Sequence, residues 1–187
     1  MNQDRRKPTL RAPRPRTISV VAASLGAAIV IAMVSAAFFV YSGLYDVSAA
    51  SGHNTVVAWL LHTTYEQSLH RHAATGNVPQ NLLSDANIRA GAQIYRATCA
   101  QCHGAPDEAL SPVGQGIMPL APKLLGAARR NNPPIMYWVI KNGVKMTAMP
   151  AFGKAFSDAQ IWQVAAFLNK GRGISALEYG ALGAAPH

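Results

Sequence analysis

The chain has 187 residues, of which 50% are hydrophobic and 13% charged, and its formal net charge is +9. This composition excludes a disordered polar chain, and two cysteines are too few for a small disulfide-stapled fold. The charge is uneven, because six of the 17 Lys and Arg but only one of the eight Asp and Glu fall in residues 1–16. A nucleic-acid-binding protein carries its basic patch on the folded domain, so this solvated arm argues against a nucleic acid partner.

An uninterrupted apolar segment follows the basic arm. Residues 17–45 contain no Asp, Glu, Lys, Arg or His. A helix over 18–41 is about 36 Å long, which exceeds the roughly 30 Å hydrocarbon core of a bilayer, so the sequence predicts a single transmembrane anchor at 17–45. The positive-inside rule assigns arm 1–16 to the cytoplasm and the rest of the chain to the periplasm, at the inner (cytoplasmic) membrane. The run is longer than the core of a signal peptide, although cleavage near Val47-Ser48-Ala49 stays an alternative.

Residues 46–80 are predicted to form an amphipathic helix and a linker. Asn54 is a suitable helix cap and Gly76 a suitable stop. Between them, apolar residues recur at every fourth position: Val57, Leu61, Tyr65 and Leu69. A stripe of this kind predicts one buried helix face. The sequence leaves open whether that face meets the membrane surface, the following domain or a partner's transmembrane subunit.

The next segment, 81–173, is predicted to form a domain of three helices. Its first helix begins at Ser84 or Asp85 and runs into the sequence Cys-Ala-Gln-Cys-His. Residues 104–132 hold too many Gly and Pro for regular structure and are predicted to form a long loop.

Two more helices follow this loop. Their expected caps and stops are Asn132 and Gly143 for one helix, and a capping box of Ser157 and Gln160 with Gly171 for the other. No stretch of the sequence alternates with period two, so the predicted fold class is all-α. Residues 174–187 are rich in Ala and Gly and are predicted to form a peripheral tail.

Both cysteines of the chain lie in Cys99-Ala100-Gln101-Cys102-His103, which has the spacing of a c-type haem attachment motif. Two helical positions three apart face the same way, so Cys99 and Cys102 can both form thioethers to one porphyrin, and His103 can bind the iron. A zinc half-site would need a second Cys/His pair, whereas the other histidines are irregularly spaced on another helix. A thioredoxin-like redox pair would need βα units, and a structural disulfide would not need the histidine.

The second axial ligand must come from elsewhere in the chain. A methionine thioether is a soft ligand that suits haem iron. Met149, followed by Pro150 in a loop that precedes a capped helix, is the best candidate. Met146 and Met118 are its rivals.

These residues resemble the class I c-type cytochromes, in a single-haem form tethered by an N-terminal helix. The resemblance covers about residues 87–172 and is most specific at 99–103. It implies the cytochrome c fold, in which the first helix crosses the last. The expected contact brings Gly91 and Tyr95 of the first helix against Val164 and Phe167 of the last.

The resemblance also implies two further site residues. The family's proline, whose carbonyl accepts a hydrogen bond from the proximal histidine, corresponds to Pro122. The family's leucine at the haem edge, two residues later, corresponds to Leu124. The expected site therefore comprises one covalently attached haem c, with iron ligands His103 and Met149.

With both axial positions filled, the expected role is outer-sphere electron transfer, without catalysis and without a small-molecule substrate. The sequence predicts a membrane-anchored electron carrier, either a tethered shuttle or an electron-transfer subunit of a respiratory complex. Its expected partners are the membrane and redox proteins such as a dehydrogenase or a terminal oxidase. The alternatives are a haem enzyme or gas sensor with an exchangeable sixth ligand, and an assembly subunit in which the haem is secondary.

Overall fold

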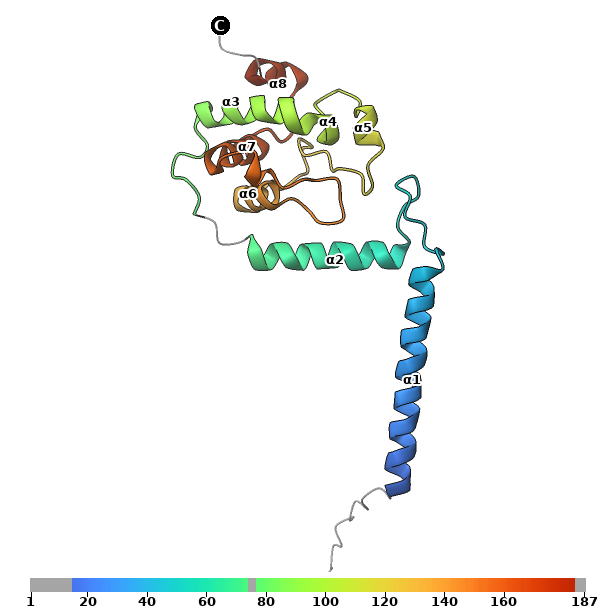
Figure 1. Cartoon of the computed structure of the whole chain (residues 1–187). Helices are drawn as coiled ribbons and strands as arrows, with labels where there is room; N and C mark the ends of the chain where they lie inside the picture. The colour runs from blue at the N-terminus through green and yellow to red at the C-terminus, as the bar shows by residue number, and fades with distance from the viewer. Residues whose placement is uncertain (1–14, 74–76, 184–187) are drawn as a thin grey trace, which may run out of the picture. The chain divides into compact units, whose positions relative to one another are not determined.

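The computed structural model of the chain describes residues 15–73 and 77–183, and every regular element in these ranges is helical. The all-α class predicted from the sequence is therefore confirmed for the described residues. The chain divides into two compact units, 1–47 and 48–187. Figure 1 shows the helices of each unit in chain order.

The first unit contains helix α1, Pro15–Tyr41, which has 27 residues. Its apolar part, Arg16–Tyr41, has a mean hydropathy of 2.3 and none of it is buried within the chain, so α1 is long and apolar enough to cross a membrane. Proline is well tolerated at the first position of a helix, because the N–H it lacks would have no partner there. Most of the basic arm, residues 1–14, lies outside the described residues.

The second unit begins with helix α2, Thr55–His72. Asn54 caps it as predicted, since its side chain accepts a hydrogen bond from the backbone N–H of Val57 at 2.9 Å. The predicted stop at Gly76 lies outside the described residues. One face at the C-terminal end of α2 is buried: Leu69 is 8% exposed and the capping residue Ala73 is 2% exposed, while His70, Arg71 and His72 are exposed.

The core of the second unit forms where α3 crosses α7 (Figure 1). Helix α3 spans Asp85–Ile94 and is capped by Ser84, and α7 spans Asp158–Lys170 and begins with the predicted Ser157–Gln160 capping box. A side chain at Gly91 would run into the backbone carbonyl of Gln163, so only glycine allows this close crossing. The rings of Tyr95 and Phe167 lie 5.4 Å apart, as the resemblance implied.

Short elements complete the unit. They are the π-helical turn η1 at Tyr95–Cys99, α4 at Ala100–His103, α5 at Pro112–Gln115, α6 at Pro133–Asn142 and the 3-10 turn η2 at Phe152–Lys154. Helix α6 is capped by Asn132 and ends at Gly143, as predicted. It packs against α7, where Tyr137 stacks on Trp162 with ring centroids 4.2 Å apart.

Part of the predicted peripheral tail, residues 176–183, has regular structure. They form helix α8, Ala176–Gly183, which packs on α3. Its Tyr179 is 5% exposed and lies against both Tyr95 and Phe167. The guanidinium of Arg96 covers the outer face of this ring at 4.6 Å. Tyr179 is therefore the main side chain that packs α8 on the core, and Leu182 also contacts the core.

Candidate haem-binding site

The cysteine motif lies where the first core helix changes from α-helical to π-helical geometry. Helix α3 widens into the π-helical turn η1, which ends at Cys99, and then continues as α4 through His103. The buried hydroxyl of Tyr95 donates to the carbonyl of Gly104 at 2.7 Å, which ties the start of η1 to the residue after the motif. The segment that carries Cys99, Cys102 and His103 is therefore held at both ends.

Both thiols are free of a disulfide and half-buried. Burial, reinforced by the neighbouring Cys102, raises the pKa of the Cys99 thiol to about 12. A redox-active cysteine pair needs a thiolate at neutral pH, so this environment disfavours the thioredoxin-like alternative. In the described ranges, His, Cys, Asp and Glu side chains nowhere gather in a group of three or more, which leaves the zinc alternative without a ligand set.

The imidazole of His103 is oriented by the chain. Its Nδ1–H donates to the carbonyl of Pro122 at 2.8 Å, which is the hydrogen bond that the resemblance implied. Nε2 is then the ring nitrogen that can bind a metal ion. Burial lowers the pKa of His103, and the positive charge of Arg129 adds to this effect, while the Pro122 hydrogen bond opposes it. The neutral ring, which is the form that ligates iron, is therefore favoured.

A buried asparagine that the sequence reading missed fixes the loop after Pro122. The Asn131 side chain is 1% exposed, and its Nδ2 donates to the carbonyls of Leu124 at 2.7 Å and Leu168 at 2.8 Å. Leu124, the expected haem-edge residue, is itself 9% exposed. Asn131 thus joins the loop that holds His103 to the last turn of α7. The available signal was weak, because asparagines are common in loops.

The side chain of Arg129 indicates whether this site suits haem. Its Nε–H is buried and meets no hydrogen-bond acceptor in the described part of the chain. Its charge acts on the pKa values of both His103 and Tyr65, so it lies close to the expected iron ligand. A buried unpaired donor is costly unless an anionic partner accepts from it. A haem carries two propionate groups of that kind, and the residues present therefore fit the cofactor.

Met149 lies in a tightly packed loop between α6 and η2. Gly143 has φ +67°, and a side chain there would clash with the backbone of residues 149–151, so the loop folds back directly over it. The N–H of Val144 donates to the carbonyl of Met149 at 3.1 Å, and the hydroxyl of Thr147 accepts from the N–H of Met149 at 3.1 Å. The backbone position of Met149 is therefore fixed from two sides.

The three candidate methionines have different surroundings. Met149 is half-buried and packs against the main core, as Cys99 and Leu124 also do. It also packs against the smaller cluster of Leu69, Ala73 and Val139, so α2 supports its loop. Met146 is 75% exposed, and Met118 is half-buried near Gly52. Packing alone thus favours Met149 as the ligand.

Comparisons with known proteins identify relatives of the segment that carries this site. Residues 86–168 match the family model described as Cytochrome C oxidase, cbb3-type, subunit III. The chain is 35% identical over 100 residues to a cytochrome c6 of Gracilaria tenuistipitata var. liui, covering 53% of this chain and 85% of that protein. It is 34% identical over 88 residues to a cytochrome c6 of a Synechococcus species, covering 44% of this chain and 69% of that protein.

A solved chain of the Kuenenia stuttgartiensis reducing HAO-like protein complex superposes with a TM-score of 0.43 and 23% identity, covering 51% of this chain and 47% of that one. The sequence relatives define the class: the chain belongs to the class I c-type cytochromes. Membership implies covalently bound haem c and a function in electron transfer, which is the role of its cytochrome c relatives.

Proposed function

We propose that this chain is a membrane-anchored, periplasmic, single-haem cytochrome c that relays single electrons. The observation that carries the proposal is the fixed orientation of the His103 imidazole. His103 is part of the haem attachment motif, and its Nδ1–H donates to the carbonyl of Pro122. The chain has two cysteines and one such motif, which supports one haem. It acts either as a tethered shuttle or as an electron-transfer subunit of a respiratory complex.

The proposed haem-holding residues divide by chemistry. Cys99 and Cys102 form the thioether bonds, and His103 and Met149 bind the iron. Arg129 pairs with a propionate, because its buried Nε–H has no other acceptor in the described residues. Leu124 packs on the haem edge. When bound, the haem supplies an iron that exchanges one electron between its ferrous and ferric states.

The chain's own residues hold the two proposed iron ligands in position. The Pro122 carbonyl holds His103 in one orientation and raises its basicity as a ligand. The hydrogen bonds of Val144 and Thr147 hold the backbone of the Met149 loop, which would position the neutral thioether for binding to the iron. With His103 and Met149 both bound to it, the iron would offer no position for a substrate, which would distinguish an electron carrier from a haem enzyme or gas sensor.

The proposed location rests on α1 and its flanking charges. Helix α1 can span a bilayer, and the basic arm at 1–16 favours a cytoplasmic N-terminus. The haem domain then lies in the periplasm. The proposed organisation is an arm at 1–16, an anchor at 17–45, α2 with its linker at 46–80, and a haem domain that begins at 81 and includes α8.

The proposed partners are redox proteins with a complementary surface. The basic residues in the segments around the site are Lys123, Arg129, Arg130, Lys141, Lys145 and Lys154. Lys141 is paired with Asp158 at 2.7 Å, whereas Lys123, Arg130, Lys145 and Lys154 are exposed. Exposed charge of one sign favours docking on an acidic partner, with a rate that falls as salt rises. The match to an oxidase subunit supports a terminal oxidase as one candidate partner.

The ligand assignment is tested with matched methionine variants of the purified full chain. Met149→Ala should abolish the far-red charge-transfer band between methionine and ferric iron and lower the reduction potential. Met146→Ala, in the same loop but 75% exposed, should change neither. If the band is absent from the unmodified protein, the electron-carrier assignment is replaced by a haem with an exchangeable ligand. If the band survives in Met149→Ala and is lost in Met146→Ala, the ligand is Met146 instead of Met149.

Two further experiments test attachment and partnership. The double variant Cys99→Ala, Cys102→Ala should lose all covalent haem, measured by extraction with acidified acetone. Purification of the full chain in mild detergent distinguishes the two forms of the proposal. A stoichiometric redox partner indicates a fixed subunit, and a solitary, reducible protein indicates a shuttle.

A further inference from the structure

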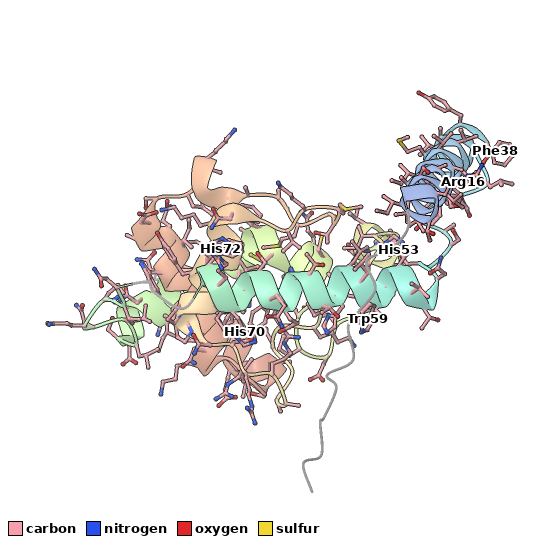
Figure 2. The ribbon with its side chains drawn as sticks, turned by 90° about the horizontal axis from the view of Figure 1, so that it is seen from below. Arg16, Phe38, His53, Trp59, His70 and His72 are labelled. Atoms are coloured by element: carbon pink, nitrogen blue, oxygen red, sulfur yellow. The ribbon has the colours of Figure 1, made fainter. Side chains whose placement is uncertain are left out.

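Helix α2 is used differently along its length. Its C-terminal half belongs to the haem domain, because Leu69 and Ala73 are buried together with Val139 of α6. The ring of His72 stacks on Trp138 of α6, with centroids 5.9 Å apart and an interplanar angle of 24°. Figure 2 shows His72 and Trp59 toward opposite ends of the helix.

The N-terminal half of α2 instead presents apolar side chains to the outside. Val56, Trp59 and Leu60 are 72%, 64% and 55% exposed. They lie three and four positions apart, so they share one helix face. Further along the same face the side chains are polar, namely Thr63, Thr64, Gln67 and Arg71. We call Val56, Trp59 and Leu60 the exposed α2 patch.

The surroundings of the patch in the chain suit a lipid surface better than a charged protein surface. Residues 47–65 contain no Asp, Glu, Lys or Arg. The linker from the end of α1 to the start of α2 is residues 42–54, which can extend over at most about 45 Å. With α1 as the anchor, this linker keeps the start of α2 within about 45 Å of the bilayer surface. Tryptophan beside aliphatic residues is the composition that favours the interface between headgroups and acyl chains.

We propose that the exposed α2 patch inserts into the interface of the membrane that α1 crosses, so that α2 lies on the bilayer and orients the haem domain. This inference rests on the proposed membrane anchor. Three side chains give weak partitioning by themselves, but the tether supplies a high effective concentration of the surface. Because the other half of α2 packs on Val139 and Trp138, docking of the patch also sets which side of the haem domain faces an electron-transfer partner.

The test reconstitutes the haem-loaded full chain alone into vesicles that contain a phospholipid with a photoreactive diazirine near its headgroup. After illumination, lipid adducts are located by peptide mass spectrometry. We expect adducts in α1 and at residues 56–60. Leu177 of α8, which is 86% exposed, serves as the internal control for an exposed apolar residue away from the membrane and should carry almost none.

The double variant Trp59→Ser, Leu60→Ser should lower the adduct yield in α2 about tenfold while leaving the yield in α1 unchanged, since two apolar side chains no longer enter the lipid. Leu177→Ser is the matched control and should alter neither yield. Both variants change exposed positions, and an unchanged haem spectrum verifies their fold. Adducts in α1 without adducts in α2, or an α2 yield that the double variant does not lower, would overturn this inference but keep the anchor. The absence of adducts in α1 would overturn the anchor and this inference together.

Discussion

Replacing Asn131 with alanine should destabilise the haem domain far more than its loop position suggests. Its Nδ2 donates to two carbonyls, those of Leu124 and Leu168, from a side chain that is 1% exposed. Leu168 lies in the last turn of α7, where helix carbonyls have no partner within the helix. Asn131 therefore caps α7 from another segment of the chain and at the same time holds the loop that follows Pro122.

The size of the effect follows from what the substitution leaves behind. Each buried carbonyl without a partner costs about 1–3 kcal/mol. We expect Asn131→Ala to lower the free energy of unfolding by about 3 kcal/mol, which corresponds to a fall in Tm of about 10 °C for a domain of this size. Asn131→Asp keeps the size of the side chain but loses both donors, so it should be at least as unstable at neutral pH.

The assay is unfolding of the haem-loaded chain by guanidinium, followed by the haem absorbance. The midpoint should fall while the slope of the transition stays the same, since the fold is unchanged. Asn169→Ala is the matched control, because this half-buried side chain makes one hydrogen bond, to the Asn131 carbonyl at 3.1 Å. It should cost no more than about 1 kcal/mol. Equal midpoints for Asn131→Ala and Asn169→Ala would refute the capping argument.

Three other substitutions test separate contacts. Gly91→Ala should destabilise the domain by about 3 kcal/mol or prevent haem loading, because its Cβ would push the backbone of α7 away; unchanged thermal unfolding would contradict this. Leu69→Ala should cost about 2–3 kcal/mol and make the charge-transfer band of Met149 disappear at a lower temperature than in the unmodified chain; a band with unchanged thermal stability would show that α2 does not support the loop. The hydrogen bond from Lys141 lowers the pKa of Asp158. The small stability from this pair is therefore present at neutral pH and is lost as the pH falls through the folded-state pKa of Asp158. Asp158→Asn should remove this part of the acid dependence, measured as Tm against pH.

The features that the sequence predicted correctly are those set by neighbouring residues. The caps at Asn54, Asn132 and Ser157 depend on a side chain reaching a backbone N–H three positions away, so they can be recognised without a fold. The apolar composition of α1 and the spacing of Cys99, Cys102 and His103 are local in the same way. The hydrogen bond between His103 and Pro122 is different, because it joins residues 19 positions apart. It was expected only because the family resemblance implied it.

The remaining features depend on contacts between distant segments, and only the tertiary structure decided them. Asn131 reaches Leu168, 37 positions away, and a buried asparagine has no sequence pattern that separates it from a loop asparagine. Helix α8 packs on the core through Tyr179, whose burial needs the rings of Tyr95 in η1 and Phe167 in α7. The same reason applies to α2: the stripe that ends at Leu69 was predicted to be buried, but the sequence left open what this face meets. The structure shows that Leu69 packs with Val139 of α6 and against Met149. Local patterns specify which helices form, but burial is a property of the assembled surfaces.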